Sequence, residues 1–168
     1  MRIALAALLL LPLPALAQQP DLLVGGLGAT DALRGDRSGV DVRLDYRPGI
    51  SLLPVLQEYF VLRPWVGAEP TSRGSVWGGG GVLLDIGVGR FALVPSVGVG
   101  GYHRGNGKDL GNVLEFRSAV ELQYKFEDQS RVGLGISHIS NAGTTPRNPG
   151  TEAIFFNYQV PLNRLFGP

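Results

Sequence analysis

The chain has 168 residues, of which 25 are glycine and none is cysteine, so disulfide bridges, thiolate metal sites and a cysteine nucleophile are excluded. Its 15 lysines and arginines, one of them Arg2, face 14 acidic residues, a balance that offers no basic surface for nucleic acid. The length fits one domain, and the glycine content disfavours a helix-rich fold.

The first 17 residues are typical of a secretory signal peptide. Arg2 gives a positive start, residues 3–13 form an apolar stretch, and Ala15-Leu16-Ala17 is a small-x-small cleavage site. An uncleaved membrane anchor is the alternative, but this apolar run is short and two prolines interrupt it. We therefore expect residues 1–17 to be a signal peptide and residues 18–168 to form one domain outside the cytoplasm.

After the leader, apolar and polar residues alternate with a period of two, which is typical of β-strands with two different faces. The clearest example runs from Val113 to Phe126, where an apolar row is interrupted only by Ser118 and the opposite row is charged. Turn residues divide the chain into eight such segments, approximately 22–29, 39–47, 58–68, 75–87, 90–102, 112–126, 130–141 and 151–161.

This pattern predicts an all-β fold, an eight-stranded antiparallel transmembrane β-barrel. The number of segments is even, many reach the length of about 10 residues that a tilted strand needs to cross a bilayer, and a closed barrel leaves no sheet edge. Short and long connections alternate, as in outer-membrane barrels with short periplasmic turns and long external loops. The long, apolar connection 48–57 breaks this rule, and a short interfacial helix is one interpretation of it. A soluble, lipocalin-like periplasmic barrel is the alternative fold.

Three polar residues fall on the apolar parity near the outer end of the last hairpin. His138 and Ser140 continue one apolar row, and Glu152 begins the next. If the hairpin is centred near residue 145, positions 138 and 152 are direct partners. A histidine can take the proton of a serine hydroxyl while a carboxylate orients the imidazole. The alternative is that all three are ordinary polar residues at the rim of the barrel.

The sequence around these residues strengthens the catalytic interpretation. The run from His138 to Gly143, His-Ile-Ser-Asn-Ala-Gly, followed by Asn148, Gly150 and Glu152, resembles the motif of the lipid A 3-O-deacylase (PagL-type) family. The resemblance implies an outer-membrane barrel that removes the 3-O-linked acyl chain from lipid A of lipopolysaccharide in the outer leaflet, releasing a 3-hydroxy fatty acid.

The same resemblance implies a role for each residue of the motif. Ser140 would be the nucleophile, His138 the general base, and Glu152 the residue that orients it. The backbone N–H of Gly143 and the side-chain amide of Asn148 would stabilise the oxyanion, and Asn141 would support the loop. For Asn141 and Asn148, a purely turn-forming role is the alternative.

Other chemistry finds little support in the sequence. His103 and His138 are far apart and no H-E-x-x-H motif occurs, so we expect neither a metal nor another cofactor. The glycine clusters from Gly78 and from Gly98 fit tight barrel packing rather than a phosphate cradle. Loop cations are candidates for contacts with lipid A phosphates, with ordinary solvated charge as an equal alternative: Arg34, Arg37, Arg73, Arg104, Lys108 and Arg147.

Three functions therefore remain open. A cofactor-independent esterase acting on lipopolysaccharide is the leading hypothesis. A non-enzymatic outer-membrane barrel, serving as a structural anchor or adhesin, would need no triad. Acyl transfer differs from hydrolysis in the acceptor, which the sequence does not reveal, and the oligomeric state is equally open.

Overall fold

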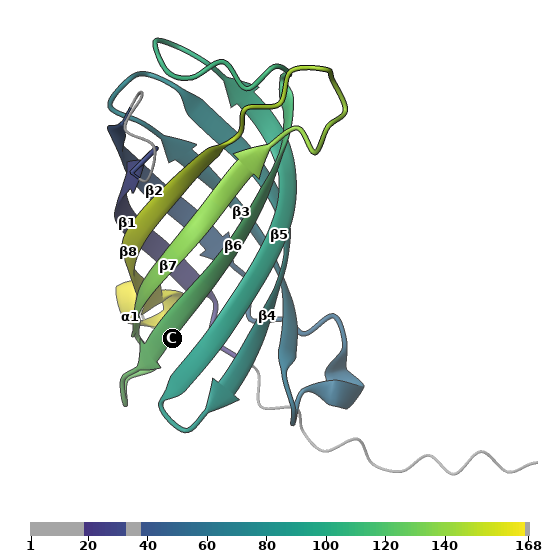
Figure 1. Cartoon of the computed structure of the whole chain (residues 1–168). Helices are drawn as coiled ribbons and strands as arrows, with labels where there is room; N and C mark the ends of the chain where they lie inside the picture. Colours follow the sequence, from purple (N-terminus) through teal and green to yellow (C-terminus); the bar gives the residue numbers. More distant parts are fainter. Residues whose placement is uncertain (1–18, 33–37, 167–168) are drawn as a thin grey trace, which may run out of the picture.

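The structure, a computed structural model, describes residues 19–32 and 38–166. The expected signal peptide, residues 1–17, lies outside these residues. Two of the loop cations, Arg34 and Arg37, lie outside them as well. Eight strands form a closed antiparallel barrel in which each strand pairs with its sequence neighbours and β1 with β8 (Figure 1). The strands are β1 (Leu22–Thr30), β2 (Gly39–Arg47), β3 (Val61–Pro70), β4 (Val76–Val88), β5 (Phe91–His103), β6 (Leu114–Lys125), β7 (Arg131–Ser140) and β8 (Thr151–Pro161).

The predicted eight-stranded barrel is thus confirmed, with one clear error in the strand limits. The third strand begins at Val61 rather than near residue 58, because residues 54–60 form tight turns that include the 3-10 helix η1 (Pro54–Leu56). A five-residue helix, α1 (Leu162–Phe166), follows β8. Within the described residues, no helix is both long and apolar enough to cross a membrane.

The two faces of each strand follow the alternation in the sequence. In β2, Val40 and Leu44 are exposed on the outside, whereas Asp41, Arg43 and Asp45 between them are at most 2% exposed inside the barrel. In β6, the charged row is likewise buried and the apolar row points outward. The barrel therefore has an apolar outer surface and a charged interior, the reverse of a soluble β-barrel.

Paired charges fill the interior. Arg117 contacts Asp45 and Glu69, each at 3.2 Å, and Arg47 donates to Glu121 at 2.7 Å. These charges form ion pairs with partners on neighbouring or opposite strands, which offsets the cost of removing them from water.

Glycines in β4 and β5 make room for two tryptophans inside the barrel. A Cβ atom at Gly98 would lie 2.5 Å from the ring of Trp65, and one at Gly100 would lie 2.8 Å from the ring of Trp77. The ring centroids of the two tryptophans are 5.9 Å apart. The interpretation of these glycines as packing residues is confirmed at these two positions.

The connections differ between the two ends of the barrel. The β4–β5 and β6–β7 turns are short and lie at the end where the described chain begins and ends, whereas the long loops after β5 and β7 lie at the opposite end (Figure 1). The β2–β3 connection, residues 48–60, is long and yet lies at the short-turn end. The suggested short helix there is a single 3-10 turn.

Candidate active site

The three residues of the predicted triad lie at the loop end of the β7–β8 hairpin. His138 and Glu152 are direct cross-strand partners, as the position of the hairpin centre predicts. Ser140 lies two residues beyond His138 on the same outward face of β7, roughly 6.6 Å along the strand. His138 is exposed, and Ser140 and Glu152 are half-buried. The strand pairing thus brings a hydroxyl, an imidazole and a carboxylate to one patch of the outer surface.

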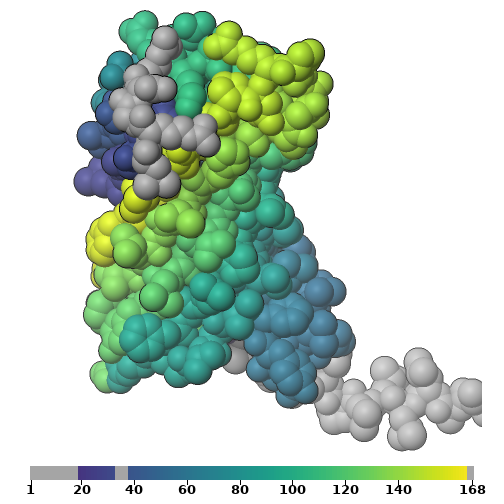
Figure 2. Space-filling view, in the orientation of Figure 1, coloured from purple at the N-terminus to yellow at the C-terminus, as the bar shows by residue number. Residues whose placement is uncertain are grey.

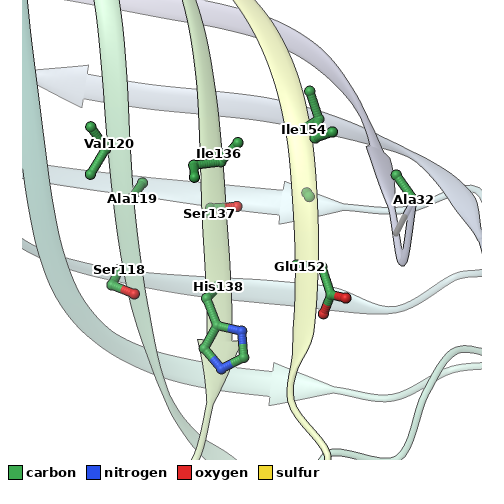
Figure 3. A pocket seen from close by; sticks show the side chains of 10 residues that line it. Ala32, Ser118, Ala119, Val120, Ile136, Ser137, His138, Glu152 and Ile154 are labelled. Carbon is green, nitrogen blue, oxygen red and sulfur yellow. The ribbon is translucent and has the colours of Figure 1, made fainter. Parts of the chain in front are cut away.

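The position of Gly150 shows which way the imidazole points. A Cβ atom at Gly150 would lie 2.5 Å from Cε1 and 2.9 Å from Nε2 of His138. Continuing the β7–β8 register by one pair puts Gly150 opposite Ser140. The Nε2 edge of the ring therefore lies at the level of Ser140, while the other ring nitrogen lies on the side of Glu152 (Figure 3).

The resulting arrangement has the polarity that a triad needs. One imidazole nitrogen is directed toward the level of the hydroxyl and the other toward the carboxylate. The structure records no hydrogen bond between the described side chains of Ser140 and His138. Catalytic hydrogen bonds are often long before substrate binds, so this does not exclude the pair.

A groove of about 480 Å³ opens beside His138 on the outer surface (Figure 3). Two parallel rows of side chains cross β6, β7 and β8 there. One row is polar and the other is apolar, and Ala32 from the β1–β2 connection also lines the groove. The polar row is Ser118, His138 and Glu152, and the apolar row is Val120, Ile136 and Ile154. The imidazole is thus at the border between a polar and an apolar surface.

Ser118 is a residue of this site that the sequence analysis missed. It is the cross-strand partner of His138 on β6 and is exposed in the groove. The sequence feature that could have identified Ser118 is that it interrupts the apolar row of the segment 112–126. The β6–β7 turn is centred on residue 128, and residues equally far from the centre of a hairpin are cross-strand partners. This rule, which pairs residue 138 with 152 across the β7–β8 loop, also pairs residue 118 with 138.

Asn141 is fully buried and organises the loop after β7. Its Nδ2 donates to the carbonyls of Leu110 (3.0 Å) and Arg147 (2.8 Å), and its Oδ1 accepts from the N–H of Gly143 at 3.0 Å. These bonds join the loop after β5 to the loop after β7. The role expected for Asn141, support of the loop, agrees with these contacts.

The two expected oxyanion donors differ in their surroundings. The N–H of Gly143 already donates to Asn141 within a tight turn closed by a hydrogen bond from Thr144 N to Asn141 O at 3.1 Å. Asn148 is exposed, and its Oδ1 accepts from the backbone N–H of Asn141 at 3.1 Å. That contact fixes the orientation of the Asn148 amide and leaves Nδ2 as its donor end.

Several of the loop cations are paired with acidic residues. Lys108 contacts Asp31 at 2.9 Å, and Arg147 and Arg104 flank Asp109 at 3.4 and 3.8 Å. Contacts with lipid phosphates therefore remain a prediction for these residues. No group of three potential metal ligands gathers anywhere in the described ranges.

Fold and site together define a small β-barrel with a candidate hydrolase site on its outward face. The profile of the family Lipid A 3-O-deacylase (PagL) matches residues 56–161, well over half of the sequence. The chain therefore belongs to this family.

Solved structures support the fold. The chain is similar to "Crystal structure of the outer membrane enzyme PagL", with a TM-score of 0.63 and 20% identity over 83% of this chain and 99% of that one. It is also similar to a chain from "De novo design of transmembrane beta-barrels", with a TM-score of 0.56 and 13% identity over 84% of this chain and 97% of that one. No curated protein sequence matches significantly.

Proposed function

We propose that this protein is an outer-membrane esterase that hydrolyses the 3-O-linked acyl chain of lipid A. The observation that carries the proposal is the cross-strand pair of His138 and Glu152, with Ser140 on the same outward face, inside the segment that matches the deacylase family. A structural anchor or adhesin has no need for this arrangement on an apolar surface, where polar side chains are costly.

The location of the site selects the substrate. The groove opens outward, away from the packed interior, and one of its two rows is aliphatic. An acyl chain can lie along Val120, Ile136 and Ile154 while its ester group extends past His138 to Ser140, the next outward residue of β7. With the long loops outside the cell, the site faces the outer leaflet, where lipopolysaccharide is found.

In the proposed reaction, Oγ of Ser140 attacks the ester carbonyl carbon and Nε2 of His138 takes the hydroxyl proton. The carbon–oxygen bond to the sugar then breaks, and the imidazolium returns the proton to the departing 3-oxygen. Water, activated by the same imidazole, hydrolyses the acyl-serine and releases the fatty acid. Glu152 orients the ring and stabilises its positive charge.

The oxyanion of the tetrahedral intermediate needs hydrogen-bond donors at the loop end of the groove. We assign the first donor to Nδ2 of Asn148, whose orientation is fixed by its contact with Asn141. The N–H of Gly143 is the second donor, and to act it must share or exchange its bond to Asn141.

Mass spectrometry of lipid A from cells that express the protein tests this function. The expected result is the loss of one hydroxyacyl chain with the wild type and no loss with Ser140→Ala. Heat-modifiable migration in the outer-membrane fraction serves as the control for folding of both proteins. A gain of an acyl chain would indicate transfer, and unchanged lipid A with correctly folded wild type would favour a non-enzymatic barrel.

A further inference from the structure

The β2–β3 connection exposes an unusual number of apolar side chains. Residues 48–60 contain a single charged residue, Glu58. Val55 is 77% exposed and Tyr59 is 68% exposed. Large apolar surface gathered on one short segment usually marks a contact with a protein or a membrane. The exposed apolar residues of this segment are Ile50, Leu52, Leu53, Val55, Leu56 and Tyr59.

Hydrogen bonds hold this segment in a fixed shape at the barrel rim. The N–H of Gly49 donates to Asp21 at 2.6 Å, and Nε of Arg63 donates to the carbonyl of Pro48 at 3.0 Å. Farther along, the N–H groups of Tyr59 and Phe60 donate to the carbonyl of Leu56 at 3.0 and 3.2 Å. The apolar side chains are therefore presented on an ordered turn structure.

The segment projects from the barrel wall beyond the end of β2. Strands β2 and β3 pair from Leu44 with Ala68 to Tyr46 with Val66, so the first residues of β3 extend beyond the end of β2. There the connection takes over, with the N–H of Leu52 bonded to the carbonyl of Leu62 at 2.8 Å. It stands out from the wall at the short-turn end of the barrel (Figures 1 and 2).

The β6–β7 turn at the same end is different in character. It carries the charged side chains of Glu127 and Asp128, and Glu127 forms an exposed ion pair with Arg90 at 2.8 Å. Such a turn is suited to water. The contrast shows that the β6–β7 turn does not share the apolar surface of the β2–β3 connection.

We infer that residues 50–59 insert into the membrane surface at the short-turn end, with a phospholipid monolayer as their partner. Their apolar surface continues that of the outward faces of the strands, they carry almost no charge, and Tyr59 is a residue type enriched at membrane interfaces. This inference rests on the proposed function, which places the barrel in a membrane. Insertion would fix the depth of the barrel at this end.

Tryptophan fluorescence in vesicles of phosphatidylcholine, with or without brominated acyl chains, tests the inference. Val55→Trp places the probe in the segment, and Glu127→Trp is the matched control in the polar turn at the same end. Leu134→Trp reports on the outward face of β7, where Leu134 is 61% exposed. The signal of native Trp65 and Trp77, both buried inside the barrel, is subtracted using the wild type. Tyr59→Trp is a second probe if Val55→Trp does not fold.

We expect the probe at position 55 to emit at shorter wavelength than the probe at 127 and to be quenched by brominated lipid at least twice as strongly. If positions 55 and 127 behave alike while position 134 is quenched, the inference is wrong and the membrane location stands. If position 134 is not quenched, the barrel is not in the bilayer and the proposed location fails with the inference. The emission at position 55 could also shift to shorter wavelength without quenching by brominated lipid, and the shift could grow with the protein-to-lipid ratio. This result would indicate contact with a second copy of the chain and overturn the inference.

Discussion

The inside and the outside of this barrel both carry ionisable side chains, but in opposite settings. Inside, Arg47 lies between Asp45 and Glu121, in a network where charges are paired and almost inaccessible. Outside, His138 and Glu152 occupy a row next to aliphatic side chains and border an open groove. The interior charges are therefore suited to holding strands together, and the outward ones to meeting a substrate. Parity along the strand, rather than residue type, separates the two roles.

The largest effect is expected from substitutions in the outward cluster, which consists of His138, Ser140 and Glu152. His138→Ala should lower turnover of lipid A by about 10⁶-fold, as loss of the base does in a well-studied triad, and Glu152→Ala should cost only about 10⁴-fold. The difference arises because Glu152 acts through the imidazole. Both variants should fold, since neither side chain fills the barrel interior. If folded His138→Ala protein turned over lipid A at the wild-type rate, the catalytic role assigned to the outward residues would be wrong.

The interior should respond in the opposite way. Arg47→Leu removes the buried arginine that pairs with Glu121, whereas Asp45 keeps its contact with Arg117, so the variant should lower the free energy of unfolding by about 3 kcal/mol. Turnover per folded molecule should not change, because the Arg47 side chain lies inside the barrel, whereas the groove is on its outer surface. Urea unfolding in phospholipid vesicles, followed by tryptophan fluorescence, measures the first quantity.

Arg90→Leu is the matched control for this variant. It removes the same side chain from an exposed ion pair with Glu127, where water and salt screen the interaction. No measurable loss of stability is expected. Equal destabilisation by the two substitutions would mean that the interior network contributes no more than a surface pair.

A smaller effect should come from Gly150, which has no side chain of its own but lies directly against the ring of His138. Gly150→Ala places a methyl group 2.5 Å from Cε1 of His138 and must displace the ring. A displacement of about 1 Å can reduce turnover about 10²-fold. Gly89→Ala in the β4–β5 turn is the control, because Gly89 also has a φ of +60° but has nothing within 4 Å of the added atom. Single-turnover assays that find equal rates for the two variants would contradict the assigned ring position.

The periodicity of the sequence predicted most of the fold and part of the site. Period-two alternation predicted the strands and their inner and outer faces, and the loop centre predicted the pairing of residues 138 and 152. The start of β3 was missed because Tyr59 and Phe60 favour strands locally, whereas their N–H groups bond to Leu56 in a turn. The hydrogen bond from Gly143 to Asn141 was also not predictable, because the conformation of a loop does not follow a periodic pattern of apolar and polar residues.

The smallest effect is expected for Ser118→Ala, and it sharpens the comparison within the outward face itself. Ser118 and Ser140 both neighbour His138, one across the strands and the other along β7. The Nε2 edge of the ring lies at the level of Ser140, against Gly150, so we expect Ser140 rather than Ser118 to be the nucleophile.

Removal of the Ser118 hydroxyl should therefore cost at most one uncharged hydrogen bond to the substrate, or about fivefold in turnover. The measurement is the rate of fatty acid release by Ser118→Ala and Ser140→Ala, each normalised to folded protein. If Ser118→Ala were inactive and Ser140→Ala active, the nucleophile would be Ser118. The catalytic line would then run across three strands, from Ser118 through His138 to Glu152, instead of along the end of β7.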